Sequence, residues 1–193
     1  TRDSRAALLH RQASAVLASR PDADPVLVAE HARLGGDVVL AARSLRDAAT
    51  RAADRFDHET AEALLDQSQR LAPDDQTLLA RARVRIRLGK YADAEADLAA
   101  ATSNRAESHQ LSAWSAYFDR RFDEAVRFAR DGELAADDDA VRARCQIVGG
   151  RTLHAAGDLA GAERLLTEAA ETAVGSDRLT ASASSNCSAI PAA

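Results

Sequence analysis

The 193-residue sequence contains no methionine and few aromatic residues, which make up 4% of the chain. These two shortages exclude a large core of interlocking Phe, Ile and Met side chains. Alanine, by contrast, supplies about a quarter of the residues, and it is the strongest helix former. We therefore expect a helical protein whose core consists of thin layers of Ala and Leu. Because a complete translation product begins with Met, we also expect the chain to be a fragment of a longer protein.

Charge, cysteine content and hydropathy argue against three further classes of protein. The net charge of −5 disfavours binding of nucleic acid by a basic surface. Cys145 and Cys187, the only cysteines, fall in a helical pattern and in a Ser-rich stretch, so a disulfide framework is not expected. The sequence contains no run of about 18 apolar residues, so it predicts no membrane helix. We expect a cytoplasmic segment without a membrane contact.

Four short stretches of the chain resemble one another, each with a bulky residue followed three places later by Ala. They begin at His58, Tyr91, Phe122 and Leu159, at intervals of 33, 31 and 37 residues. A period near 34 with this spacing is the signature of the tetratricopeptide repeat, a pair of antiparallel helices that stacks on copies of itself. The Ala of each stretch should face the partner helix, where a larger side chain would separate the two helix axes.

The breaks between the helix-like runs favour an all-α fold. Seven such runs fall at 58–71, 75–88, 91–102, 106–119, 122–135, 140–156 and 159–173. Connections this short force neighbouring helices to be antiparallel. We therefore predict a right-handed superhelix of antiparallel helix pairs, which is a tetratricopeptide-like α-solenoid.

Composition divides the chain into three predicted parts. Pro21 and Pro25 interrupt the first helical stretch, and Gly35-Gly36 ends the second, so residues 1–36 are predicted to form an N-terminal helical hairpin. Residues 37–173 are predicted to hold the repeats. The Ser- and Ala-rich segment 174–193 has too little apolar surface to offset the entropy of ordering it, so we expect a flexible tail.

One repeat departs from the pattern. Arg81 and Arg85 occupy positions where a Leu and an aromatic residue are usual. The layer around them is therefore expected to be thin or shifted in register. The N-terminal rhythm also differs, because only 20 residues separate Val38 from His58. We expect the long helix between them to contact two neighbours.

The first helix of each pair should line the inner face of the superhelix. The repeat register places eight side chains on this face: Arg43, Arg46, Arg83, Arg87, Trp114, Tyr117, Arg151 and His154. An arginine-rich groove with two aromatic residues could hold an acidic peptide or a small anionic ligand. The alternative is that the arginines are solvated and paired with nearby Asp and Glu, while Trp114 fills a layer of the core.

Three patterns that suggest metal or catalytic chemistry are incomplete. His58-Glu59 begins like a zinc-protease motif, but the second His is missing. The run 137–139 of three Asp residues lacks the spaced oxygen ligands and the Gly of a calcium loop, and is typical of a capped helix start. Cys145 has no base near it in the sequence that could activate the thiol. We predict no catalytic residue, no metal site and no cofactor.

An ordered set of short motifs in the N-terminal half resembles one known family. The motifs are 9–13 (LHRQA), 21–25 (PDADP), 29–37 (AEHARLGGD), 52–56 (AADRF) and 71–73 (LAP). Their order is similar to the segment that follows the ATPase and winged-helix regions in large ATP-binding bacterial transcriptional regulators of the LuxR type. The resemblance covers residues 5–173. It implies a sensor arm that binds an inducer or partner and controls an ATPase and DNA-binding module elsewhere in the parent chain.

The active parts of that family are absent from this sequence. Gly89-Lys90-Tyr91 lacks the hydroxyl and the upstream Gly of a phosphate loop. The resemblance therefore predicts a non-catalytic segment without direct nucleic acid contact. Its partners would be a protein or small-molecule inducer in the concave groove and other domains of the regulator. Two alternatives remain, a free-standing peptide-binding adaptor of the tetratricopeptide type and a helical support domain of an unrelated enzyme.

Overall fold

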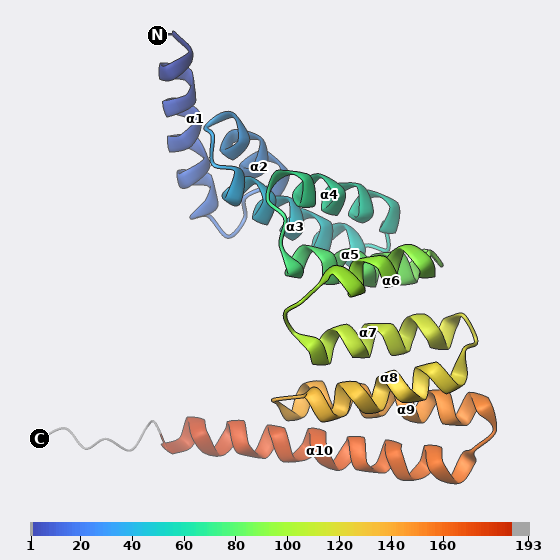
Figure 1. Ribbon diagram of the computed structural model, residues 1–193. Helices are drawn as coiled ribbons and strands as arrows, with labels where there is room; N and C mark the ends of the chain where they lie inside the picture. The colour runs from blue at the N-terminus through green and yellow to red at the C-terminus, as the bar shows by residue number, and fades with distance from the viewer. Residues whose placement is uncertain (1, 187–193) are drawn as a thin grey trace, which may run out of the picture. The chain divides into compact units, whose positions relative to one another are not determined.

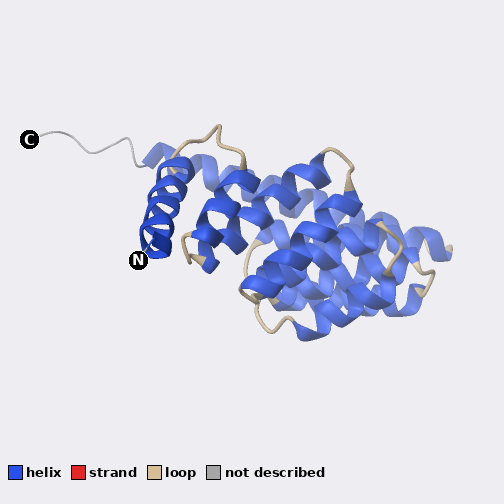
Figure 2. Ribbon diagram, turned by 90° about the horizontal axis from the view of Figure 1, so that it is seen from above, coloured by secondary structure: helices blue, strands red, loops and turns tan. Residues whose placement is uncertain are grey.

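The computed structural model describes the backbone of residues 2–186 and the side chains of residues 4–173. Within that part of the chain every regular element is an α-helix (Figures 1 and 2). The helices are α1 (Arg2–Ala18), α2 (Pro25–Leu34), α3 (Val38–Asp54), α4 (His58–Leu71), α5 (Asp75–Arg87), α6 (Tyr91–Ala100), α7 (Arg105–Phe118), α8 (Phe122–Ala135), α9 (Asp139–Ala156) and α10 (Leu159–Asn186). The prediction of an all-α fold is confirmed. None of the described helices is both long enough and apolar enough to cross a membrane.

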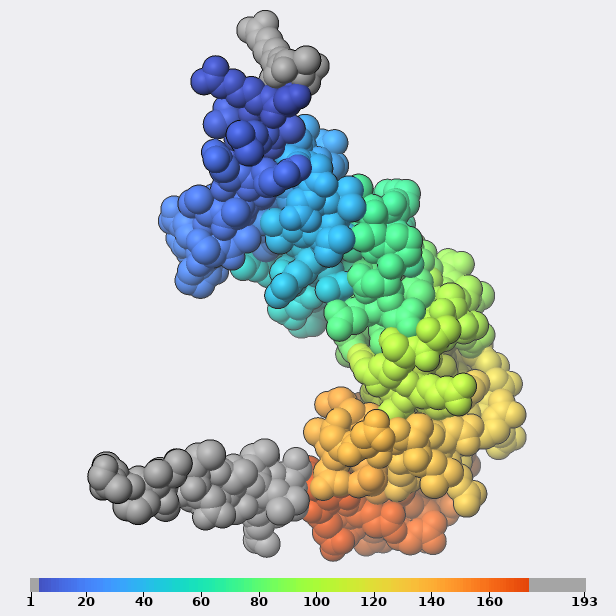
Figure 3. Space-filling view, turned by 60° about the vertical axis from the view of Figure 1, so that its left-hand side comes forward, coloured from blue at the N-terminus to red at the C-terminus, as the bar shows by residue number. Residues whose placement is uncertain are grey.

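The helices group into two compact units. Unit 1 spans Thr1–Thr102 and unit 2 spans Ser103–Ala193. In unit 1 the helices from α1 to α6 pack in chain order, each consecutive pair in contact, and the colours of Figure 3 follow this order from blue to green. Helix α3 also contacts α5. In unit 2 the helices α7 to α10 follow the same order, and α7 also lies against α9. These contacts between alternate helices are those of stacked helix pairs. The sequence did not predict the division near residue 102.

Five tight turns reverse the chain by one hydrogen-bond pattern. In each turn one residue takes a positive φ: Gly36, Phe56, Gly89, Arg120 and Gly157. The amide of the following residue donates to a carbonyl in the last turn of the helix, as from Asp57 to Ala52 at 3.0 Å. The same bond from Asp158 to Leu153 measures 2.9 Å. This Schellman geometry ends α2, α3, α5, α7 and α9 and directs the chain into an antiparallel partner.

A second kind of turn follows the partner helices. Helices α4, α6 and α8 end in extended backbone, at Ala72, Ala101 and Ala136. The next helix in each case is preceded by a capping residue, which is Asp74, Asn104 or Asp138. Its side-chain oxygen accepts a hydrogen bond from a backbone amide in the first turn of that helix. The two kinds of turn alternate from α3 onward, and this alternation is how the sequence repeat is expressed in the backbone.

Small residues form the contacts between helices. The four repeat alanines are at most 3% exposed: Ala61, Ala94, Ala125 and Ala162. The contact at Gly150 leaves no room even for a methyl group, since a Cβ atom there would lie only 2.7 Å from Cγ of Leu166 on α10. The close approach expected at Gly and Ala positions is therefore present, and it explains how helix pairs with so few large side chains can be dense.

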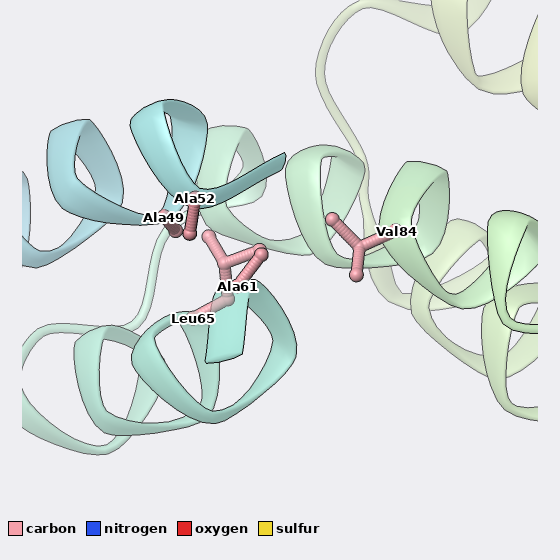
Figure 4. Packing of buried hydrophobic residues seen from close by; sticks show 5 residues of the cluster. All are labelled: Ala49, Ala52, Ala61, Leu65 and Val84. Carbon is pink, nitrogen blue, oxygen red and sulfur yellow. The ribbon is translucent and has the colours of Figure 1, made fainter. Parts of the chain in front are cut away.

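The apolar core of unit 1 includes one layer shared by three helices. Figure 4 shows Ala49 and Ala52 of α3 beside Ala61 and Leu65 of α4, with Val84 supplied by α5. Leu65 is 1% exposed and is among the largest fully buried side chains. The long helix α3 therefore contacts α4 and α5 in addition to α2, which is one neighbour more than the two predicted.

The layer around Arg81 and Arg85 is filled by charges. Arg81 donates to Asp66 on α4 at 2.8 Å and to Asp97 on α6 at 2.6 Å. Arg85 donates to Asp97 at 2.8 Å and to Glu62 at 3.1 Å. Hydrogen bonds to Asp97 raise the pKa of Arg81 above its ordinary value. This layer, expected to be thin or shifted, is instead an ionic layer that joins α4, α5 and α6, and these five residues are called the ionic layer below.

The last helix extends further than the sequence predicted. Backbone helix continues to Asn186, whereas the repeat pattern stops at Val174. A helix already held by packing gains one hydrogen bond for each added residue, and Ala-rich sequence resists this elongation least. Residues 187–193 lie outside the described part of the chain, so the predicted flexibility of that stretch stays a prediction, as does the boundary predicted at residue 36.

Candidate ligand-binding site

Four of the eight side chains that the repeat register selected line one pocket of unit 2. Trp114 and Tyr117 lie three residues apart on α7, and Arg151 and His154 lie three residues apart on α9. Residues at this spacing share one face of a helix, and α7 packs against α9. The pocket has a volume of about 390 Å³, within the range of small ligand sites. Their role in binding stays a prediction.

The α7 side of the pocket is an aromatic cluster. The rings of Trp114 and Phe118 are stacked, with centroids 5.6 Å apart and planes 23° from parallel. Tyr117 meets Trp114 edge-on at 5.6 Å and Phe118 at 5.2 Å. Phe118 is nevertheless 43% exposed. The cluster therefore holds its rings in fixed positions and leaves aromatic surface open to a ligand.

The α9 side of the pocket is cationic. The guanidinium carbon of Arg151 lies 5.7 Å from the centre of the Trp114 ring, which is cation–π geometry. No carboxylate of the described residues forms an ion pair with Arg151, and none lines the pocket. His154, one turn later, is exposed. The site thus combines uncompensated positive charge with apolar surface, which favours a ligand that carries a carboxylate next to an apolar group.

Packing between α9 and α10 forms another wall of the pocket. Leu166 of α10 lines the pocket and is 38% exposed. Its side chain also contacts Gly150, where a Cβ atom would meet both Leu166 Cγ at 2.7 Å and Cδ2 at 2.8 Å. A larger residue at position 150 would displace this leucine. Gly150 therefore positions Leu166, and the sequence indicated only that Gly150 is a close-contact residue.

The other four predicted side chains belong to unit 1, and they do not share one pocket. Arg46 is engaged internally, since it donates to Asp74 at 2.7 Å and to Thr77 at 3.2 Å. The paired alternative therefore holds for Arg46. Arg43 lines a pocket at the junction of α1, α2 and α3. Arg83 and Arg87 line a different pocket, at the turn between α3 and α4.

The other groups that could carry chemistry have structural surroundings. The described residues include no group of three or more His, Cys, Asp or Glu side chains arranged to hold a metal. Cys145 is fully buried, and burial, with a smaller contribution from the charge of Glu133, raises the pKa of its thiol to about 11. A buried, protonated thiol is a poor nucleophile. Sequence reasoning also missed the contact between His10 and His31, whose Nδ1 atoms lie 2.9 Å apart.

Comparison with known proteins defines the fold and no more. No family model matches the chain, and no curated protein matches its sequence. A solved structure of MamA (41-end) from Desulfovibrio magneticus RS-1 is similar, with a TM-score of 0.66 and 16% identity over 89% of this chain and 97% of that one. The MamA RS-1 ArsTM double mutant gives 0.65 and 17% over 89% and 96%.

This likeness shows the fold alone, because the sequence identity is so low. It agrees with the prediction of a tetratricopeptide-like helical solenoid, which the helix order and the buried alanines also support. Nothing in the comparisons supports an origin in a regulator of the LuxR type.

Proposed function

We propose that the chain is a non-catalytic adaptor module that binds an acidic peptide segment of a partner protein in the pocket of unit 2. The segment carries at least one carboxylate next to an apolar or aromatic side chain. This proposal corresponds to the adaptor alternative raised by the sequence. The interpretations as a regulator arm and as a support domain of an enzyme gain nothing from the geometry or the comparisons.

The observation that carries the proposal is the setting of Arg151. Arg46, Arg81 and Arg85 each donate to carboxylates of their own unit. Arg151 instead faces the Trp114 ring and forms no ion pair with a described carboxylate. A guanidinium has five N–H donors in a planar fork, and a carboxylate fits two of them at once. The free donors of Arg151 therefore offer a specific position for a carboxylate from outside the chain.

The neighbouring side chains would supply the remaining binding energy. An apolar side chain beside the bound carboxylate would cover the exposed edge of Phe118 and contact Leu166. Aromatic residues and arginine are the residues that dominate binding energy in protein interfaces. His154 gives a second polar contact at the rim. A hydrogen bond to a charged group contributes about 1.5–3 kcal/mol, so such a pocket needs both contributions for a useful affinity.

The single tryptophan of the chain provides a direct test. A short peptide of alternating Glu and Leu, capped at both ends, is titrated against the protein while Trp114 fluorescence is followed. A matched peptide of alternating Gln and Leu is the control. We expect a saturable change with the Glu peptide and at least a tenfold weaker response with the Gln peptide.

Charge reversal locates the response. Arg151→Glu should abolish the fluorescence change, because it replaces the proposed partner of the carboxylate with a like charge. Arg144→Glu is the matched control, since Arg144 is exposed on the same helix and lies outside the pocket. Equal responses of the two variants, or equal binding of the two peptides, would contradict the proposed function.

A further inference from the structure

Phe56 occupies a backbone conformation that phenylalanine rarely adopts. Its φ is 62°, in the left-handed region. At the same place in three other turns the chain has glycine: Gly36, Gly89 and Gly157. Glycine is the usual residue at this position of a Schellman turn, because it has no Cβ atom to clash with the backbone. A bulky residue at positive φ is a true outlier.

The fold shows no packing that compensates for this strain. Phe56 is 83% exposed, the highest value among the large hydrophobic residues of the described chain. Its ring meets His58 edge-on, with centroids 6.3 Å apart. Exposure of an apolar ring in a strained backbone is unfavourable on both counts. Strain that the structure does not need for its own packing is a feature of functional sites.

The surroundings of Phe56 contain polar groups suited to a ligand. Phe56 lines a pocket of about 270 Å³ together with His58, Asp54, Arg83 and Arg87. The Nδ1 atom of His58 is shielded from solvent and has no hydrogen-bond partner among the described residues. A buried polar atom without a partner is unusual and calls for an explanation. Because this atom has almost no solvent-accessible surface, a ligand in the pocket would meet the exposed part of the His58 ring and not this nitrogen.

The charges around Phe56 indicate the sign of that ligand. The pocket has two arginines and one aspartate, so its formal charge is positive. Arg87 has no ion pair with a carboxylate of the described residues. An anionic partner segment is therefore complementary to the pocket. Nucleic acid fits less well, because the whole chain carries a net charge of −5.

We propose that the turn between α3 and α4 is a second docking site, separate from the pocket of unit 2. Its occupant is an acidic peptide segment of a partner protein, against which the Phe56 ring packs. The Phe56 ring covers an apolar side chain of the segment. Arg87 pairs with a carboxylate of the segment, and the His58 ring, which lines the same pocket, lies beside the bound segment. This site does not depend on the function proposed for unit 2, since it shares no residue with that pocket.

The test is a substitution that relieves the strain and removes the ring. Phe56→Gly, made in the Arg151→Glu protein to disable the pocket of unit 2, is titrated with the fluorescein-labelled Glu–Leu peptide by anisotropy. We expect saturable binding by the Arg151→Glu protein and at least tenfold weaker binding after Phe56→Gly. Phe56→Asn, which also tolerates positive φ, should give the same loss.

Stability separates a binding role from a structural one. Phe56→Gly should melt at the same temperature as the parent or higher, because glycine adopts positive φ without strain. Arg120→Gly, at the equivalent turn in unit 2, should keep the peptide affinity unchanged. The proposal is overturned by a lower melting temperature of Phe56→Gly, by unchanged affinity after that substitution, or by the absence of saturable binding to the Arg151→Glu protein. A null result in Trp114 fluorescence with intact anisotropy would instead reject only the pocket of unit 2.

Discussion

Arg81 and Asp97 form a two-bond ion pair between α5 and α6, with Nε and Nη2 of the arginine 2.9 Å and 2.6 Å from the two carboxylate oxygens. Asp97 is 4% exposed, and the same carboxylate also accepts a hydrogen bond from Arg85 at 2.8 Å. The two arginines therefore depend on one buried acid. In a solenoid with so little apolar bulk, this ionic layer takes the place of an apolar layer.

Removal of Asp97 should destabilise unit 1 strongly. Asp97→Asn leaves Arg81 and Arg85 with one carboxylate fewer in a largely desolvated position, and loss of one partner from a buried pair costs about 3–5 kcal/mol. Asp93→Asn, at an exposed position on the same helix, should cost less than about 1 kcal/mol. Urea denaturation of both variants gives the free energies of unfolding. Equal midpoints would show that the ionic layer contributes little.

Glu62 should make the stability depend on pH only in acid. Burial opposes ionisation of Glu62 most strongly, but hydrogen bonds from Lys90 and Arg85 together lower its pKa below the ordinary value of 4.5. The unfolded chain then binds the proton first as pH falls, so the contribution of Glu62 is complete above about pH 4.5 and is lost as pH falls through the lower folded pKa.

The measurement compares the parent with Glu62→Gln across pH. The difference in free energy of unfolding should be constant from pH 6 to 8 and shrink below about pH 4.5. If this difference in free energy of unfolding instead grew in acid, the pKa of Glu62 would be raised by folding, which would contradict the prediction.

The repeat alanines should not tolerate enlargement. Ala94 and Ala162 are 0% and 3% exposed, so Ala94→Trp or Ala162→Trp would have to separate two helices. We expect a loss of several kcal/mol, above the ~1–3 kcal/mol typical of overpacking. Ala96→Trp, at an exposed position on α6, is the matched control. Thermal melts in which all three variants match the parent would show that the assignment of helix contacts is wrong.

The thiol of Cys145 should be inert in the folded protein. It is 0% exposed, and burial raises its pKa to about 11. In a Cys187→Ser protein at pH 7.5, labelling by a thiol-specific reagent should be slow and should become fast on addition of denaturant. Fast labelling of the native protein would mean that α9 opens readily from α7 and α8.

The contacts that follow from the repeat period were predictable, and those that depend on long-range partners were not. Ala61 and Ala94 are buried because the helical period places them at the partner helix in any copy of the repeat. The pairing of Arg81 with Asp97 was missed, since the repeat template offers an apolar residue there and gives no reason to connect the two. The positive φ of Phe56 was also missed, because a phenylalanine does not signal a left-handed turn residue.

In the candidate site, too, the contacts set by the repeat period were predictable and those set by other helices were not. The repeat register brought Trp114 and Arg151 together although 37 residues separate them, because α7 and α9 are equivalent helices of successive pairs. It could not foresee that Arg46 would be engaged by Asp74. Whether an arginine is paired with a carboxylate depends on side chains from other helices, and a repeat pattern does not specify those side chains.

Photo-cross-linking tests the proposed function most directly. The Glu–Leu peptide, with one Leu replaced by a benzophenone amino acid, is irradiated with the protein, and the adducts are located by mass spectrometry. We predict adducts on α7 around Trp114 and on α10 around Leu166, competed by unlabelled Glu peptide and absent in Arg151→Glu. A lack of adducts on both helices, or adducts on these two helices that persist in Arg151→Glu, would contradict a carboxylate-binding pocket in unit 2.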